Sequence, residues 1–155
     1  MAIRNYTSKI SPNQTAGKMQ KLLAEHDARR VSIEYGDNGD PQAVTFQMDV
    51  EGRPLWFRIA PDVRGMLKAM EDDDGVPSSR CNEEQAARTA WKNKYDWLDA
   101  QLAEVASNQA RLEQLLLGFG VTDDGRTVYE RLEESGRLLN APRADALPEN
   151  SRRVG

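Results

Sequence analysis

Residues 31–59 read VSIEYGDNGDPQAVTFQMDVEGRPLWFRI, and this stretch carries the clearest structural signal in the chain. Hydrophobic residues alternate with polar ones over residues 31–35 and 44–48, and residues 55–59 form a third apolar run. A period of two residues is typical of a strand that buries one face. Turn-forming residues separate the three runs, at 36–41 and 51–53. The pattern predicts an antiparallel three-stranded meander.

The segments on either side of this meander extend the prediction. Ser11 followed by Pro12 is a typical helix start, and the helix is expected to end near His26. We expect it to cover the buried face of the sheet. A short edge strand is predicted at residues 6–10, which makes three to four strands. Asp62 is expected to cap a short helix that ends at Met70, with four apolar residues facing inward: Val63, Met66, Leu67 and Met70.

The second half of the chain predicts a long amphipathic helix. Residues 82–117 contain neither glycine nor proline, so a continuous helix there would be on the order of 50 Å long. Whether it is continuous stays open. Its apolar stripe has helical spacing: Ala87, Trp91, Leu98, Leu102, Val105, Leu112 and Leu116. A second apolar edge (Ala90, Trp97 and Leu115) makes the face wider than one small sheet can cover, which predicts a homo-oligomer formed through this helix.

These elements predict an α+β protein organised in four parts. The sheet layer spans residues 1–70, an acidic and flexible linker spans 71–81, and a helical half spans 82–140. Gly118 is expected to end the long helix in a left-handed conformation, and a short C-terminal helix is expected from Thr127. Residues 141–155 are predicted to be a mobile tail.

Composition and charge narrow the class of protein. The chain has 155 residues, of which 39% are hydrophobic and 30% charged, which indicates a folded domain. The net charge is −4, divided into +2 for residues 1–70 and −6 for residues 71–155. Nonspecific nucleic-acid binders carry a strong basic excess, so nucleic acid is a permitted partner but not an indicated one. With one cysteine, no signal peptide and no membrane-length apolar run, we expect a cytosolic protein.

The side chains that could carry catalysis are isolated from one another. His26 is the single histidine, and Cys81 has no histidine near it in sequence. Residues 72–75 resemble part of a calcium loop but lack its ligand spacing. Residues 118–120 lack the last glycine of a dinucleotide-binding fingerprint. We therefore expect no enzyme activity, no metal and no cofactor.

The densest group of binding residues lies in the long helix. Aromatic and basic side chains are interleaved there, and such groups can stack on a base and bind a phosphate. The alternative is that Trp91 and Leu98 belong to the core and that Trp97 covers a dimer contact. The candidate ligand-binding or interface residues are Arg88, Trp91, Lys94, Tyr95, Trp97 and Gln101. A candidate nucleic-acid surface on the sheet consists of Tyr35, Arg53, Trp56 and Arg58.

The same helix segment resembles a family of short conserved hypothetical proteins of tailed phages and prophages. The resemblance rests on Arg88, Ala90, Trp91, Lys92, Asp96, Trp97, Ala100, Gln101, Leu102 and Ala103. Four other segments are also similar: residues 5–10, 63–70, 125–129 and 138–139. The resemblance therefore covers most of residues 3–140. This chain departs from the family at residues 116–119, where relatives have a Phe-Leu-Pro-Tyr-like run. The resemblance implies a phage or prophage origin and supplies no activity.

Two functions of different kinds follow from these observations. The first is a non-catalytic phage accessory protein that acts by binding, either by sequestering a small nucleotide or by blocking a host defence factor. The alternative is a nucleic-acid-binding protein for phage replication, recombination or transcription. A metal-dependent nuclease or phosphodiesterase is the least favoured, because no paired acidic motif supports it.

Overall fold

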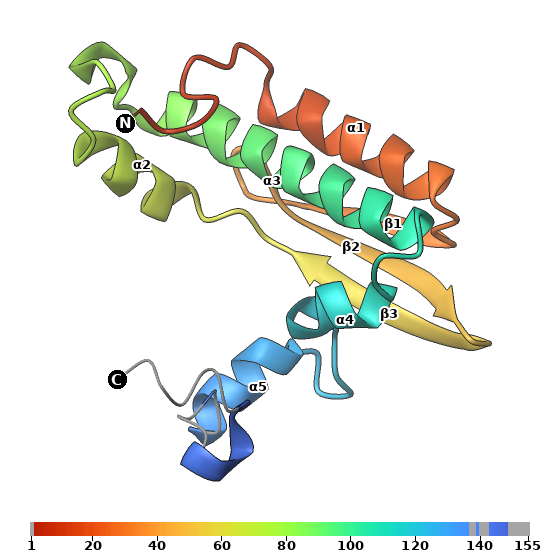
Figure 1. Ribbon diagram of the computed structural model, residues 1–155. Helices are drawn as coiled ribbons and strands as arrows, with labels where there is room; N and C mark the ends of the chain where they lie inside the picture. Colours follow the sequence, from red (N-terminus) through yellow and green to blue (C-terminus); the bar gives the residue numbers. More distant parts are fainter. Residues whose placement is uncertain (1, 137–138, 140–142, 149–155) are drawn as a thin grey trace.

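The computed structural model describes residues 2–136, 139 and 143–148, and it confirms the α+β class (Figure 1). Five α-helices and three strands follow in the order α1 (Pro12–Glu25), β1 (Arg30–Tyr35), β2 (Pro41–Val50), β3 (Arg53–Ile59), α2 (Val63–Glu71), α3 (Glu83–Ala106), α4 (Leu112–Leu116) and α5 (Val128–Ser135). Three short 3-10 turns accompany them, η1 (Ser78–Arg80), η2 (Leu117–Phe119) and η3 (Ala144–Ala146).

The strands form the predicted antiparallel meander, in the order β1-β2-β3. Phe46 at the centre of β2 lies opposite Val31 on one side and Phe57 on the other. The turn between β2 and β3 contains Glu51 at φ 51° and Gly52 at φ 79°. Positive φ at both turn residues gives a turn whose twist matches that of the flanking strands.

The main core lies between one face of the sheet and a layer formed by α1 and α3, which lie side by side (Figure 1). Val44, Phe46, Met48 and Val50 of β2 point into this core, as the period of two predicts. Phe46 and Phe57 stack with their ring centroids 5.5 Å apart. The largest buried side chains are Trp91, Phe46, Phe57, Met19, Leu23, Ile59, Leu98, Leu102 and Leu116.

The N-terminal segment does not form the expected edge strand at residues 6–10. It runs along α3 instead and makes turns. The side-chain amide of Gln85 donates to the carbonyls of Tyr6 (2.7 Å) and Ser8 (2.9 Å). A helix side chain therefore satisfies backbone groups that a strand would have paired with another strand.

A second, smaller core lies between α2 and the first turns of α3. It is centred on Met70, Val76 and Ala86, and the four apolar residues predicted to face inward from α2 all contribute to it. Asp62 caps α2 as expected, accepting from the amide of Gly65 at 2.9 Å. Val76 lies in this core at 6% exposure and Cys81 packs against it, whereas most of residues 71–81 are exposed, so the flexibility of this linker stays a prediction.

The long helix ends at Ala106, which answers the question that the sequence left open: the apolar stripe of residues 82–117 is divided between α3 and α4. Asn108 has φ 60°, and α4 begins only at Leu112. Asparagine is, after glycine, the residue that most readily ends a helix in the left-handed conformation. Gly118 does not adopt that conformation and instead lies within η2.

The chain after α4 covers the outer edge of β3. Gly120 forms a bridge with Phe57, and the amide of Val121 donates to the carbonyl of Trp56 at 2.7 Å. The predicted C-terminal helix, α5, follows and is capped reciprocally by Thr127 and Glu130. The predicted mobile tail, residues 141–155, lies largely outside the described residues.

Candidate functional site

The candidate binding residues of α3 do not form one site. Trp91 is 1% exposed and belongs to the main core, which confirms the alternative interpretation that it is a core residue. It cannot stack on a ligand, because both faces of its ring are covered. Arg88 is engaged by Glu84 at 2.6 Å and by Gln85 at 3.2 Å. Tyr95 is half-buried and packs against the main core.

Lys94, Trp97 and Gln101 do share one side of α3, where they are half-buried. Phe119 of η2 completes the group, with its ring centroid 5.1 Å from that of Trp97. The Lys94 ammonium lies 5.2 Å from the centre of the Trp97 ring and 5.9 Å from that of Phe119. Burial lowers the pKa of Lys94, and within the described chain the ammonium contacts aromatic rings and no carboxylate.

The candidate nucleic-acid surface is divided by the fold. Trp56 and Arg58 share one face of β3, whereas Arg53 has the opposite parity and pairs with Glu113 of α4 at 3.7 Å. Tyr35 lies opposite Pro41 and Trp56 opposite Gln47, six positions along β2, which separates them by about 20 Å. The four residues therefore do not form a continuous stacking surface.

The one basic residue of that set that remains on the open face of the sheet is already paired. Arg58 donates to Glu34 of β1 at 2.9 Å, although the two strands are separated by β2. The ion pair therefore crosses the middle strand, above Ala43, which is fully buried. A phosphate would have to displace Glu34 before it could bind Arg58.

A concave site does exist where three helices begin. We call it the helix-start groove; its volume is about 710 Å³. Its walls come from the first turns of α1, α2 and α3 and from the turn between β1 and β2. The residues that line it are Ser11, Pro12, Asn13, Asn38, Asp40, Pro41, Gln42, Pro61, Asp62, Val63, Arg64, Glu83, Glu84, Ala87, Arg88 and Trp91.

Two guanidinium groups, four carboxylates (Asp40, Asp62, Glu83 and Glu84) and the first turns of three helices line this groove. The first four N–H groups of a helix have no partner within the helix, and together with the helix dipole they favour anions. Asp62 and Glu84 are engaged in capping α2 and in pairing with Arg88. Arg64, in contrast, is exposed and forms no ion pair within the described residues.

Among the polar residues of this groove, the sequence pattern identified only Arg88 as a candidate binding residue. Arg64, Asn13, Asn38 and Gln42 come from separate elements. No spacing pattern relates them, because only the packing of three helix starts against one turn brings them together.

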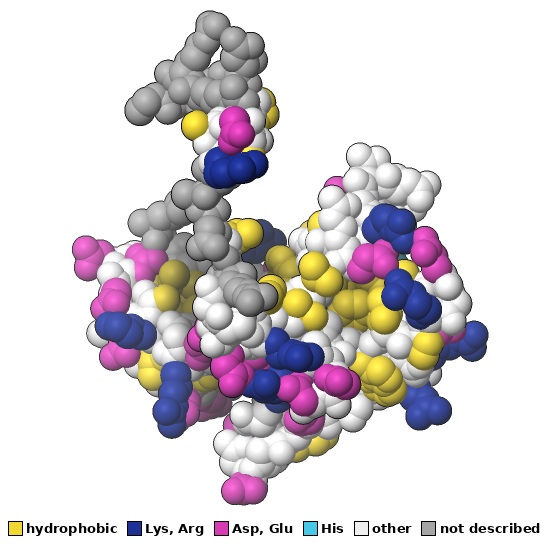
Figure 2. Space-filling model, turned by 90° about the horizontal axis from the view of Figure 1, so that it is seen from below, with side chains coloured by type: hydrophobic (Ala, Val, Ile, Leu, Met, Phe, Trp, Pro, Cys, Tyr) yellow, Lys and Arg dark blue, Asp and Glu magenta, His cyan; other side chains and the backbone are white. Residues whose placement is uncertain are grey.

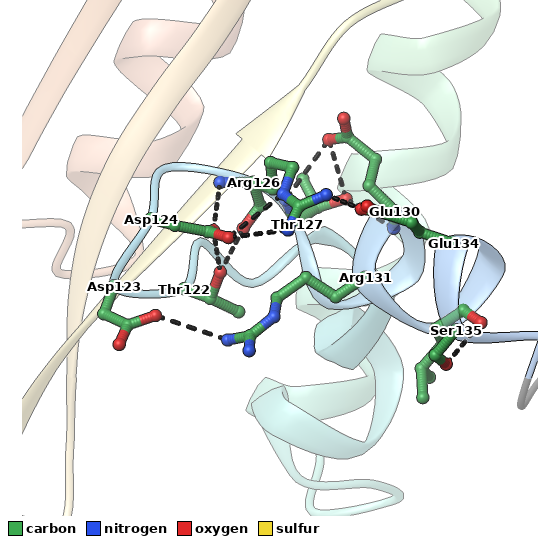
Figure 3. Close-up of polar contacts among 10 residues, drawn as sticks. Thr122, Asp123, Asp124, Arg126, Thr127, Glu130, Arg131, Glu134 and Ser135 are labelled. Carbon is green, nitrogen blue, oxygen red and sulfur yellow. Dashed lines mark hydrogen bonds and ion pairs between the residues drawn. The ribbon is translucent and has the colours of Figure 1, made fainter.

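The charged side chains of the turn before α5 pair with one another and with residues of α5 in a dense polar network (Figure 3). Asp124 accepts from the Thr122 hydroxyl at 2.8 Å and from both the amide and the guanidinium of Arg126. Arg126 also pairs with Glu134, and Arg131 pairs with Asp123 at 3.3 Å. The carboxylates are thus occupied by donors of the same segment, and the network fixes the turn against α5.

The wide apolar face of α3 is covered within the chain itself. Ala90 is 5% exposed, and Trp97 packs against Phe119. The exposed large hydrophobic side chains lie elsewhere, among them Leu117 (59% exposed), Tyr129 (53%) and Leu132 (40%) of η2 and α5. Seen from below, where α5 lies, hydrophobic side chains gather at the centre of the molecule with charged ones around them (Figure 2).

The described residues form neither a metal-ligand cluster nor a membrane-spanning helix. That part of the chain contains no group of three or more His, Cys, Asp or Glu side chains placed to hold a metal ion. None of its helices combines the length and the apolar character needed to cross a bilayer. The Cys81 thiol lies 3.5 Å from the carbonyl of Met70 and is half-buried.

No family model, curated protein or solved structure matches this chain. The resemblance to phage and prophage proteins therefore stays a prediction.

Proposed function

We propose that this chain is a non-catalytic phage or prophage accessory protein that acts by binding, and that the helix-start groove sequesters a small nucleotide. The observation that carries the proposal is the meeting of Arg64 and Arg88 with the first turns of three helices in one groove. Sequestration requires tight binding and no chemical step, which agrees with the scattered carboxylates of the chain.

Each part of the groove suits a part of a nucleotide. The guanidinium of Arg64 and the first-turn amides suit a phosphate, because charge-assisted hydrogen bonds to phosphate are strong and Arg binds it through two donors. The side-chain amides of Asn13, Asn38 and Gln42 can donate to and accept from the edge of a base or a ribose. A volume of about 710 Å³ falls within the usual range for small-molecule sites.

The proposal is tested first by native mass spectrometry of protein purified gently from cells that express it. A retained mass of a few hundred daltons per subunit, lost on denaturation, is the expected result. Calorimetric titration with a panel of mononucleotides, dinucleotides and cyclic nucleotides then identifies the class of ligand. If no nucleotide is retained and none binds, sequestration of a nucleotide is refuted.

Substitutions locate the ligand. Arg64→Gln and Arg88→Gln should each weaken binding about tenfold, because each removes a charge-assisted contact worth roughly 1.5 kcal/mol. Arg80→Gln is the matched control, since Arg80 is half-buried like Arg88, lies near the start of α3 and does not line the groove. Equal affinities in all three variants would move the ligand to another site.

Self-association is also part of the proposal, but through a different surface from the α3 face that the sequence indicated. The α3 face that suggested it is covered within one chain, so an oligomer would use the exposed side chains of η2 and α5. Light scattering coupled to gel filtration tests this, with Tyr129→Ser and Leu132→Ser as variants that should dissociate the assembly. A monomeric wild-type protein at high concentration would remove the oligomer from the proposal.

A further inference from the structure

A second groove lies at the opposite ends of α1 and α3, and it is apolar at its base. We call it the acid-rimmed groove; its volume is about 680 Å³. It lies between the ends of α1 and α3, the turn between β2 and β3, and the start of α4. The residues that line it are Glu25, His26, Asp27, Met48, Asp49, Val50, Glu51, Leu102, Val105, Ala106, Arg111, Leu112 and Glu113.

The base of this groove consists of hydrophobic side chains that continue into the main core. Met48, Val50, Leu102 and Leu112 are each 9% exposed or less, and Val105 is half-buried. Val105 therefore keeps more contact with solvent than the other four. Such a surface gains free energy when another apolar group covers it.

The rim of the groove is strongly negative. Five carboxylates line it against one guanidinium, that of Arg111, and the formal charge of the lining is −4 with His26 neutral. Helices α1 and α3 both end here, and neither has a basic residue in its last turn. Helix C-termini carry negative partial charge, so both ends add to the field of the carboxylates.

Part of this charge is balanced within the chain, and part is not. Arg111 pairs with Glu51 and Glu113, and Arg29 pairs with Asp49 at 3.0 Å. Glu25 and Asp27 form no ion pair within the described part of the chain. These two carboxylates flank the end of α1 and leave it the most negative side of the groove.

We infer that the acid-rimmed groove docks a segment of a partner protein that presents a large apolar side chain flanked by lysine or arginine. The apolar base selects the hydrophobic side chain, and the unbalanced carboxylates select the flanking cations. Complementary charge of this kind guides encounter and excludes acidic partners. The inference is independent of the nucleotide proposal, since the two grooves share no lining residue.

The probes are three fluorescein-labelled synthetic peptides built on repeats of Lys-Leu-Leu-Lys, Glu-Leu-Leu-Glu and Lys-Ser-Ser-Lys, measured by fluorescence anisotropy with the full chain. The inference expects binding of the first peptide, weakened by added salt, and little binding of the other two. Equal binding of the acidic and basic leucine peptides overturns it.

Variants tie the binding to this groove. The double variant Glu25→Gln with Asp27→Asn should weaken binding of the basic leucine peptide by roughly tenfold, because each rim charge contributes a factor of about three. Asparagine tolerates the φ of 69° at position 27, so the fold should be retained. The control is Asp99→Asn with Glu104→Gln, an equal change in charge at exposed positions of α3 outside the groove.

A blocking variant tests the apolar base. Ala106→Arg places a cation and a long side chain at the edge of the groove, where an arginine also suits the end of α3. It should abolish binding of the basic leucine peptide. If the double variant binds like its control, or if Ala106→Arg binds like the wild type, the inference is wrong. A wild-type dimer that Ala106→Arg dissociates in sedimentation would instead make the occupant a second copy and also overturn it.

Discussion

Replacing Gln85 by methionine tests how the N-terminal segment is held to the fold. Gln85 is 4% exposed, and its amide donates to the carbonyls of Tyr6 and Ser8. Methionine has nearly the same length and a similar helix propensity, so Gln85→Met removes the hydrogen bonds to Tyr6 and Ser8 with little change in packing. It also removes the oxygen that accepts from Arg88, but Arg88 keeps its pairing with Glu84. Both carbonyls then lose their partner while they remain next to α3.

The expected loss of stability follows from those two bonds. A hydrogen bond contributes about 1 kcal/mol net, and a buried acceptor left without a donor costs about 1–3 kcal/mol. Water can reach part of this segment, so we take the lower end and expect a loss of about 2 kcal/mol in the free energy of unfolding. For a chain of this size that corresponds to a fall of about 4–8 °C in the melting temperature.

Urea unfolding measures the loss, and hydrogen exchange shows where it acts. Gln20→Met is the control, because Gln20 is exposed on α1 and makes no side-chain hydrogen bond within the described residues. In Gln85→Met the amides of Tyr6 and Ser8 should exchange faster, since their turns are held against α3 by Gln85. A stability within 0.5 kcal/mol of the control, a margin of about the size expected for a surface change, together with unchanged exchange, would refute this reasoning.

Two further predictions concern the C-terminal half. Hydrogen bonds from the Thr122 hydroxyl and from Arg126 hold the pKa of Asp124 well below its usual range. The folded pKa is therefore below the unfolded value of about 3.9. The ionised carboxylate stabilises the fold fully above about pH 4, and this stabilisation is lost as pH falls through the folded pKa. NMR titration of this carboxyl should give that low midpoint, and Asp124→Asn should remove the acid-dependent loss of protection of α5 amides; a midpoint near 3.9 would contradict it. Asn108→Val should cost about 1–2 kcal/mol in urea unfolding and Asn108→Gly only a few tenths, because valine is strained at positive φ; equal costs would show that this residue does not determine where α3 ends.

The sheet and the short helices could be predicted because their signals are local. Alternation in residues 31–59 determines which side chains face the core, and Ser11, Asp62 and Thr127 are helix caps whose partners lie three residues away. Each of these signals depends only on neighbouring residues. The structure confirms all of them.

The end of α3 and the path of the N-terminal segment could not be predicted in the same way. Apolar spacing continues past Ala106 into α4, so the periodicity gave no sign that the helix stops at Asn108. The segment that contains Tyr6 is held by hydrogen bonds from Gln85, Thr89 and Asn93, which lie about 80–90 residues later in the chain. Contacts of that range leave no mark in a local pattern.

The candidate sites show the same difference between signals that are local in sequence and contacts that depend on long-range packing. The aromatic and basic residues of α3 are close in sequence, but a helix distributes them around its axis. Trp91 therefore belongs to the main core, whereas Lys94 contacts the rings of Trp97 and Phe119. Arg64 and Arg88 are far apart in sequence, and the packing of α2 on α3 brings both into one groove. Candidate binding residues that are close together in the sequence were therefore a poor guide to which residues lie together in the folded protein.

The bridge between Gly120 and Phe57 bears on how the protein is made. During synthesis β3 is complete about 60 residues before the segment that covers its edge, which at ~5–20 residues per second leaves that edge open for roughly 3–12 seconds. An open strand edge can pair with another chain on the same polysome. Crowded translation of this protein should therefore be the stage at which it is most prone to misassemble, and a chain truncated before Gly120 should depend on chaperones far more than the complete one.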